Sequence, residues 1–213
     1  MTAELMTNSL TTYLDSLVPP RPVEMQKMEA HAEEIRFPII GSTCGYLCYQ
    51  LARMVNARKV FEMGSGYGYS TAWFARAVRE NGGGVVHHVV WDEDLSGEAQ
   101  QHLSALGYDD LVQYHVGEAI NTLKQSSEHF DLIFNDINKE SYPQSLPVIK
   151  EKLRPGGLLI VDNILWGGSV LDDTNNSPST EGVREFTQMM QDDPDWIVSI
   201  IPIRDGIMTA YLR

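Results

Sequence analysis

The sequence predicts an α/β domain whose mostly parallel, doubly wound sheet is covered by helices on both faces and finishes with an antiparallel strand. Between residues 59 and 161, short apolar runs alternate with segments whose apolar residues recur every three or four positions. The last two apolar runs follow one another with only a short turn between them. A length of 213 residues suits one hydrophobic core, so residues 1–213 are expected to form a single domain.

The predicted elements follow in chain order. Helices are expected before residue 58. Five runs are typical of strands: KVFEM (59–63), VVHHVV (85–90), LVQYHV (111–116), FDLIF (130–134) and GLLIV (157–161). Helical patterns separate them, for example at 70–80 and 141–153. Such alternation predicts parallel strands with helices on both faces of the sheet.

The carboxyl-terminal part departs from this alternation. WIVSIIPI (196–203), the turn RDG and IMTAYLR (207–213) leave no room for a helix between two strands, so they predict a hairpin. The segment 167–180, GGSVLDDTNNSPST, is long and polar. A loop of this length in a compact domain is a lid, a binding loop or a disordered segment.

The composition excludes several classes of function. A net charge of −13 without a Lys/Arg cluster disfavours binding to nucleic acid. No run approaches the ~20 apolar residues of a membrane helix, and the first ten residues lack the pattern of a signal peptide. We therefore expect a cytoplasmic protein with no membrane partner. Cys44 and Cys48 lack further metal-ligand partners at suitable spacing and are expected to be reduced, buried thiols.

A glycine-rich turn follows the first predicted strand. In VFEMGSGYGYS (60–70), the strand leads through three alternating glycines into a helix, a setting that lets the backbone approach a nucleotide-like ligand. The fingerprint of nicotinamide-binding folds requires its third glycine at position 69, where Tyr69 stands, so pyrophosphate binding is disfavoured. Asp92 ends the second strand and is placed to bind the two hydroxyls of a ribose. A solvated strand-end acid is the competing interpretation.

Several separated motifs together resemble one family. They are VFEMGSGYGYSTAWFARAV, HVGEA (115–119), FDLIFNDINKESY, LRPGGLLIVDNILWGG and IPIRDGIMTAYLR. In this order they are similar to the cation-dependent, S-adenosylmethionine-dependent O-methyltransferases, the group that contains catechol and caffeoyl-CoA O-methyltransferases. The resemblance implies a Rossmann-like sheet of seven strands with the last strand antiparallel. It also implies that residues 1–57 form a helical cap and acceptor-site segment, and that the protein is a homodimer.

The resemblance also implies a set of cofactor-binding residues. Glu62, Gly64, Gly66 and Ser70 would line the methionine end of S-adenosylmethionine. Asp92 would bind the ribose, Glu118 and Ala119 would flank the adenine, and Asp136 would also lie at the cofactor.

Polar residues at the ends of two strands predict a metal site. Asp136 ends the fourth strand, and Asp162 with Asn163 ends the fifth, at the edge where parallel strands collect ligands. Two carboxylates and an amide oxygen suit Mg²⁺, with Ca²⁺ or Mn²⁺ as alternatives. The same three positions are metal ligands in the family. Three protein ligands leave room for both oxygens of a vicinal diol, which favours a small catechol-like phenolic substrate.

Lys139 stands at the position of the family's catalytic lysine, three residues beyond Asp136. Near a divalent cation and a sulfonium, its neutral amine is expected to take the proton of the phenol. The competing interpretation of residues 135–140 is a solvated loop. Trp166 either stacks on the acceptor ring or belongs to the core. Asn138 replaces the acid often found there in the family, which bears on the choice of metal.

Other functions are compatible with parts of this pattern. The same cofactor could serve a non-catechol small molecule, with the metal only structural. A regulatory cofactor-binding module would not need Asp136, Lys139, Asp162 and Asn163 together. A nicotinamide oxidoreductase is disfavoured by Tyr69.

Overall fold

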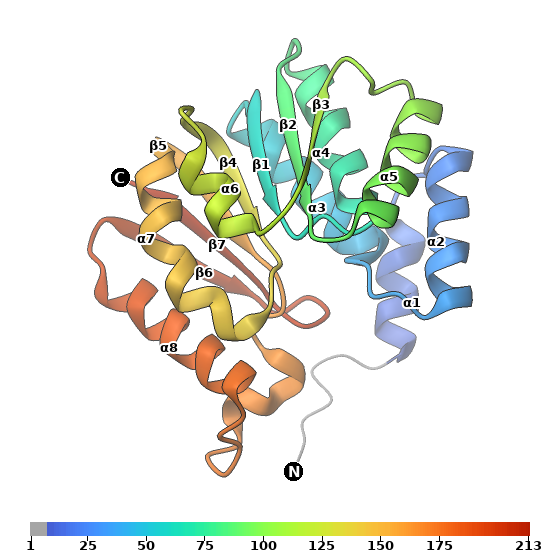
Figure 1. Ribbon diagram of the computed structural model, residues 1–213. Coiled ribbons are helices and arrows are strands. Elements are labelled where there is room, and N and C mark those ends of the chain that lie inside the picture. The colour runs from blue at the N-terminus through green and yellow to red at the C-terminus, as the bar shows by residue number, and fades with distance from the viewer. Residues whose placement is uncertain (1–7) are drawn as a thin grey trace.

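The computed structural model describes residues 8–213, which form one seven-stranded sheet with helices on both faces (Figure 1). Residues 1–7 of the predicted helical segment 1–57 lie outside the described residues. The helices are α1 (Asn8–Leu17), α2 (Val23–Ile35), α3 (Gly41–Met54), α4 (Tyr69–Glu80), α5 (Glu93–Ala105), α6 (Ala119–Gln125), α7 (Tyr142–Lys152) and α8 (Pro178–Asp192). The strands are β1 (Lys59–Met63), β2 (Val85–Val90), β3 (Val112–Val116), β4 (Phe130–Asn135), β5 (Leu153–Val161), β6 (Trp196–Ile201) and β7 (Ile207–Leu212). Two short 3₁₀ helices, η1 (Lys139–Ser141) and η2 (Trp166–Leu171), follow β4 and β5.

The order of the strands confirms the predicted fold class. The sheet runs β3-β2-β1-β4-β5-β7-β6; β1 to β5 are parallel, and β7 is antiparallel to both β5 and β6. The predicted hairpin is therefore present. From β1 the chain proceeds to β2 and β3 on one side of the sheet, and then returns to place β4 on the other side of β1. The order of the strands therefore reverses between β1 and β4. In open α/β sheets, ligands bind outside the carboxyl ends of the strands at this reversal.

Two hydrophobic layers hold the sheet between the helices. On one face, residues of α2 to α5 pack against alternate strand residues such as Val60 and Phe134. On the other face, residues of α6 to α8 pack against the intervening residues such as Phe61 and Ile133. The central strands β1, β2 and β4 are thus buried on both faces, as their nearly continuous apolar runs predict, whereas the edge strands β3 and β6 are partly exposed.

Most element boundaries agree with the sequence, and β5 is the main exception. It begins at Leu153, because that residue pairs with Phe130 across a register shift, before the apolar run at 157–161. Cys44 and Cys48 are free and buried in α3, as predicted, and burial raises the pKa of the Cys44 thiol to about 12. Within residues 8–213, no helix has the length and apolar character needed to cross a membrane.

Candidate active site

A pocket of about 560 Å³ opens at the carboxyl ends of the parallel strands. Its walls come from segments that are distant in sequence, each of which follows a strand or joins two helices. They are residues 37–40, 64–67, 69–70, 89–91, 136–140 and 162–163, together with Leu95, Gly117, Ala119, Trp166, Ser179 and Arg204. The pocket therefore lies at the reversal between β1 and β4 where the fold predicts a ligand.

The glycine turn after β1 forms one wall. Gly64 and Gly66 have φ values of +87° and +51°, which side-chain-bearing residues rarely adopt. A Cβ on Gly64 would lie 2.3 Å from the carbonyl oxygen of Asp136, so the turn packs directly against the end of β4. Together with Ser70, these two glycines line the pocket, as the sequence predicts for the cofactor-binding residues.

Glu62 lies beneath this turn and is completely buried. Its Oε2 accepts a hydrogen bond of 2.5 Å from the Thr71 hydroxyl, whereas Oε1 has no hydrogen-bond partner among the described residues. Burial raises the pKa of the carboxyl to about 7, although the hydrogen bond from Thr71 lowers it. Glu62 is not among the residues that line the pocket, and its contact with the methionine end of the cofactor stays a prediction.

Two predicted cofactor-binding acids are used as helix caps. The Oδ1 of Asp92 accepts hydrogen bonds from the backbone N–H groups of Asp94 and Leu95 at the start of α5. The carboxylate of Glu118 accepts from Ile120 and Asn121 at the start of α6. Neither acid lines the pocket. Their contacts with ribose and adenine stay predictions.

Residues beside these caps do line the pocket. Ala119 is among them, as predicted. Trp91 also contributes to the wall, although its side chain is 67% exposed, which is unusual for a large aromatic residue. The sequence analysis missed Trp91, and its only available signal was an aromatic residue directly after the second strand.

The predicted metal ligands and the lysine converge on the opposite wall. The backbone N–H of Asp162 donates to the carbonyl of Asn135 at 3.1 Å, which places the ends of β4 and β5 side by side. Asp136, Lys139, Asp162 and Asn163 all line the pocket. Only 7% of the Lys139 surface is exposed, so this residue is not part of a solvated loop.

The position of the Lys139 amine is fixed by two hydrogen bonds. Its Nζ donates to Asp136 Oδ1 at 2.8 Å and to the Ile137 carbonyl at 3.2 Å. It also lies 5.0 Å from the ring centroid of Tyr142 and 5.9 Å from that of Trp166. Trp166 is half-buried and lines the pocket, and its stacking on an acceptor ring stays a prediction.

The two aspartates form an acidic pair. Burial and the charge of Asp136 together raise the pKa of Asp162 to about 7, against the charges of Lys139 and Arg204, which lower it. Burial also raises the pKa of Asp136, although its ion pair with Lys139 lowers it. Among the described residues, no three His, Cys, Asp or Glu side chains form a metal-binding group. The predicted ligand set has only two such side chains, because its third member is the Asn163 amide.

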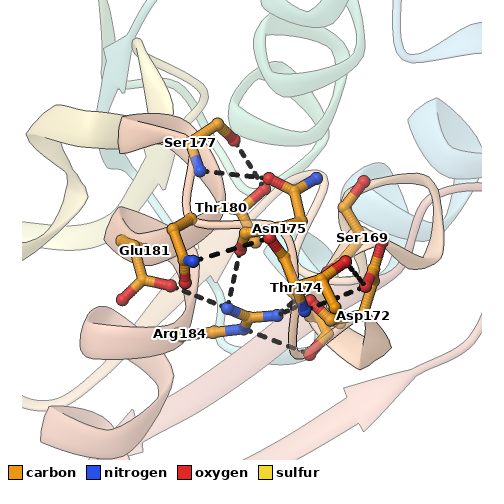
Figure 2. Close-up of polar contacts among 10 residues, drawn as sticks. Ser169, Asp172, Thr174, Asn175, Ser177, Thr180, Glu181 and Arg184 are labelled. Carbon is orange, nitrogen blue, oxygen red and sulfur yellow. Dashed lines mark hydrogen bonds and ion pairs between the residues drawn. The ribbon is translucent and has the colours of Figure 1, made fainter.

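Of the predicted loop 167–180, Ser179 lines the pocket and residues 167–178 do not. Residues 178–180 already belong to α8. Figure 2 shows that Arg184 of α8 holds this loop by hydrogen bonds to several of its carbonyls. Its guanidinium donates to the carbonyls of Asp172 and Asn175 at 2.6 and 2.9 Å and pairs with Glu181. The loop is therefore folded onto α8.

Comparisons with known proteins give one family. The model of the O-methyltransferase family matches residues 23–212. A catechol O-methyltransferase of Niastella koreensis is 34% identical over 144 residues, 66% of this chain and 64% of that protein, so the chain spans somewhat less than two thirds of that relative. A catechol O-methyltransferase of Mycobacterium tuberculosis is 30% identical over 164 residues, 76% of this chain and 73% of that protein.

Two solved structures have the same fold over almost the whole chain. The O-methyltransferase TomG of Streptomyces achromogenes, involved in tomaymycin synthesis, was solved in complex with SAM. It covers 96% of both chains with a TM-score of 0.86 and 29% identity. An O-methyltransferase of Bacillus cereus in complex with SAH covers 100% of both chains with a TM-score of 0.88 and 25% identity.

Proposed function

Since this chain belongs to the O-methyltransferase family, we propose that it transfers the methyl group of S-adenosylmethionine to one hydroxyl of a small catechol-like phenol, with a divalent metal ion at the acceptor. The observation that carries this proposal is the convergence of Asp136, Lys139, Asp162 and Asn163 on the wall opposite the glycine turn. Such a pocket holds a nucleotide-like cofactor on one side and a metal-bound acceptor on the other.

The glycine-turn wall fits S-adenosylmethionine. The left-handed backbone at Gly64 and Gly66 leaves the wall free of side chains, so the backbone can approach a ligand closely. Two of the related structures hold SAM or SAH. When bound, the cofactor supplies a methyl group activated by a sulfonium. Trp91 and Ala119 offer apolar surface to the adenine end of such a ligand.

The opposite wall fits a divalent cation of the Mg²⁺ type. Two partly or fully buried carboxylates whose charges repel one another are a costly arrangement unless a cation offsets them. Asp136, Asp162 and Asn163 would hold the ion through oxygen atoms, the ligands that Mg²⁺ prefers. When bound, it supplies positive charge that favours the phenolate form of the acceptor.

Lys139 is proposed to take the proton of the phenol. Its Nζ is held by Asp136 and the Ile137 carbonyl beside the predicted metal ligands. The reaction starts from the neutral amine of Lys139, which the positive charges of a bound metal ion and the sulfonium would favour over the ammonium form. The phenol proton then moves to Nζ, the phenolate oxygen forms a bond to the methyl carbon, and the carbon–sulfur bond breaks. S-adenosylhomocysteine leaves without a covalent enzyme intermediate. Trp166 orients the acceptor ring, so most of the rate enhancement comes from positioning and electrostatics.

The test is a mass-spectrometric assay of the purified protein with S-adenosylmethionine and a panel of catechols and matched monophenols. It is run with Mg²⁺ and again with EDTA. We expect one added methyl group on catechols only, and no product with EDTA. Methylation that persists in EDTA would assign the metal a structural role and favour a non-catechol acceptor. Absence of product from every panel member would refute the catechol acceptor class.

A further inference from the structure

Arg204 occupies a strained position in the turn between β6 and β7. Its φ is +48°, in the left-handed region that side-chain-bearing residues rarely adopt. Gly206, two residues later, has a φ of +83° and is the residue type such positions favour. Glycine would adopt the backbone conformation of Arg204 without strain. An arginine at this strained position points to a function for its side chain.

The turn is fixed to one wall of the pocket. The backbone N–H groups of Ile164 and Leu165 donate to the carbonyls of Gly206 and Asp205 at 3.1 and 2.9 Å. These bonds attach the turn to the segment that leads from the predicted metal ligands to Trp166.

The guanidinium of Arg204 also contacts the other wall. Its Nη1 donates to the carbonyl of Ile39 at 2.8 Å, in the segment that connects α2 to α3. Arg204 is exposed to solvent and lines the pocket, so its charge lies at the mouth between the two walls.

The guanidinium of Arg204 has no carboxylate of the described residues at ion-pair distance, although its charge lowers the pKa values of Asp15, Asp136 and Asp162. Within residues 8–213, no ion pair joins Arg204 to an acidic side chain, and one backbone carbonyl accepts from a group with five N–H donors. Lys139, the other cation of the lining, is paired with Asp136. Among the described residues that line the pocket, Arg204 is therefore the positively charged side chain that has no acidic partner and can bind an anion.

We propose that Arg204 binds a carboxylate of the acceptor, and that the preferred acceptors are catechols bearing a carboxylate. This inference rests on the proposed methyl transfer to catechols. The ring would lie between the half-buried Phe37 and Trp166, and the carboxylate would reach the mouth of the pocket. A planar guanidinium binds a carboxylate through two parallel hydrogen bonds, which also fixes the orientation of the ring.

The net charge of the chain makes such a residue necessary for an anionic substrate. A charge of −13 repels anions at long range. The positive charge of Arg204 at the mouth of the pocket would attract an anionic substrate and so oppose this repulsion where the substrate enters. A purely structural Arg204 that only holds the Ile39 carbonyl would affect neutral and anionic acceptors equally, so the two roles can be separated.

The experiment compares 3,4-dihydroxybenzoate with its neutral analogue 3,4-dihydroxybenzamide. We expect Arg204→Gln to lower kcat/KM for the benzoate by about 10- to 100-fold, the usual effect of losing a hydrogen bond to a charged group. The value for the benzamide should stay within about threefold, which also shows that the variant is folded. Arg204→Lys, which keeps the charge but not the planar fork, should have an intermediate effect. An equal loss for both acceptors would refute the inference.

Arg213 provides a matched control. It is exposed at the opposite end of β7, and its Nη1 likewise donates to one backbone carbonyl, that of Pro194 at 2.8 Å. Arg213→Gln changes the net charge by the same amount and should leave the ratio of the two kcat/KM values unchanged. A similar change of ratio in Arg213→Gln would assign the effect to net charge and overturn the role of Arg204.

A binding measurement separates this inference from the proposed reaction. Calorimetric titration of both compounds into the protein with S-adenosylhomocysteine and Mg²⁺ should give weaker benzoate binding only in Arg204→Gln. If the wild type binds the benzoate through Arg204 but methylates neither compound, methyl transfer to catechols is wrong and the anion site stands. If it methylates both compounds with no dependence on Arg204, the reaction stands and the anion site is wrong.

Discussion

The two walls of the pocket are built in different ways. The glycine-turn wall, residues 64–70, is one continuous stretch that runs from the end of β1 into α4. The acceptor wall is assembled from residues 136–140, 162–166 and Arg204, which come from three separate parts of the chain. Arg204 also contacts the carbonyl of Ile39, 165 positions away in the sequence. The difference teaches that local sequence determines the first wall, whereas strand order and loop packing determine the second.

The two walls also differ in what their residues contribute. The glycine-turn wall presents backbone to the ligand and rests on the buried Glu62. The acceptor wall presents charged side chains, above all Asp136, Lys139 and Arg204. Substitutions in the first wall should therefore reduce stability and cofactor affinity together, whereas substitutions in the second should reduce turnover in a folded protein.

The largest expected effect is on the acceptor wall. Lys139→Ala should lower kcat by about 10²- to 10⁴-fold, because a positioned general base contributes this much to a proton transfer. The affinity for S-adenosylmethionine, measured by calorimetry, should change by less than about threefold, since that ligand is assigned to the other wall. Lys150→Ala is the control, because this lysine of α7 pairs with Asp193 and Asp195. Normal turnover by Lys139→Ala would remove the general-base role.

Gly64→Ala tests the contact between the two walls. The new Cβ would lie 2.3 Å from the carbonyl oxygen of Asp136, and the backbone is left-handed. We expect the free energy of unfolding in urea to fall by about 2 to 5 kcal/mol, the sum of a left-handed alanine and an overpacked contact. Gly82 also has a left-handed φ, of +96°, but a Cβ there meets nothing within 4 Å. Gly82→Ala should therefore lose only about 1 to 2 kcal/mol. Equal losses would show that the contact adds nothing.

The sequence could predict most of the fold for a physical reason. The central strands of this sheet are buried on both faces, so runs such as 132–134 are apolar throughout and end abruptly in polar residues. The same ends locate Asp136 and Asp162, because parallel strands bring their carboxyl ends to one edge. Boundaries that depend on pairing, such as the early start of β5, have no comparable local signal.

Glu62→Gln tests whether the buried carboxyl group beneath the glycine turn makes the stability of the protein depend on pH. Burial raises the pKa of this carboxyl from about 4.5 to about 7, so the folded chain favours the protonated form. The contribution of Glu62 to stability is therefore fully present below about pH 4.5, is lost as the pH rises to about 7, and is constant above that value. The neutral glutamine avoids this loss.

The expected advantage of Glu62→Gln over the wild type grows by about 2 kcal/mol between pH 5 and pH 8, as measured by urea unfolding without cofactor. Glu29→Gln is a useful control, since this half-buried acid already has an ion pair with Arg21. A pH-independent difference between Glu62→Gln and the wild type would mean that the carboxyl titrates alike in the folded and unfolded chains.

Part of the site could not be predicted, because one sequence pattern serves two purposes. An acid between a strand and a helix is the pattern of a ribose ligand and also of a helix N-cap. Asp92 and Glu118 both have this pattern, and both are caps in the structure. Arg204 had no signal at all, because its importance depends on a turn that lies beside the Ile39 carbonyl only in the folded chain.

Substitutions of Asp92 have the smallest expected effect, and they separate its role as a helix cap from its predicted role as a ribose ligand. Asp92→Ala removes a cap that accepts two backbone N–H bonds, so the free energy of unfolding should fall by about 1 kcal/mol. Asp92→Asn should restore that stability, since asparagine caps as well as aspartate. Its amide oxygen would then be occupied by the cap, and its NH₂ group cannot accept from a ribose hydroxyl. If Oδ2 of Asp92 binds the ribose, Asp92→Asn should weaken S-adenosylmethionine binding about tenfold in calorimetry without loss of stability. Unchanged affinity would leave Asp92 as a cap alone, and recognition of the cofactor would then depend on the glycine turn and the apolar surface beside it.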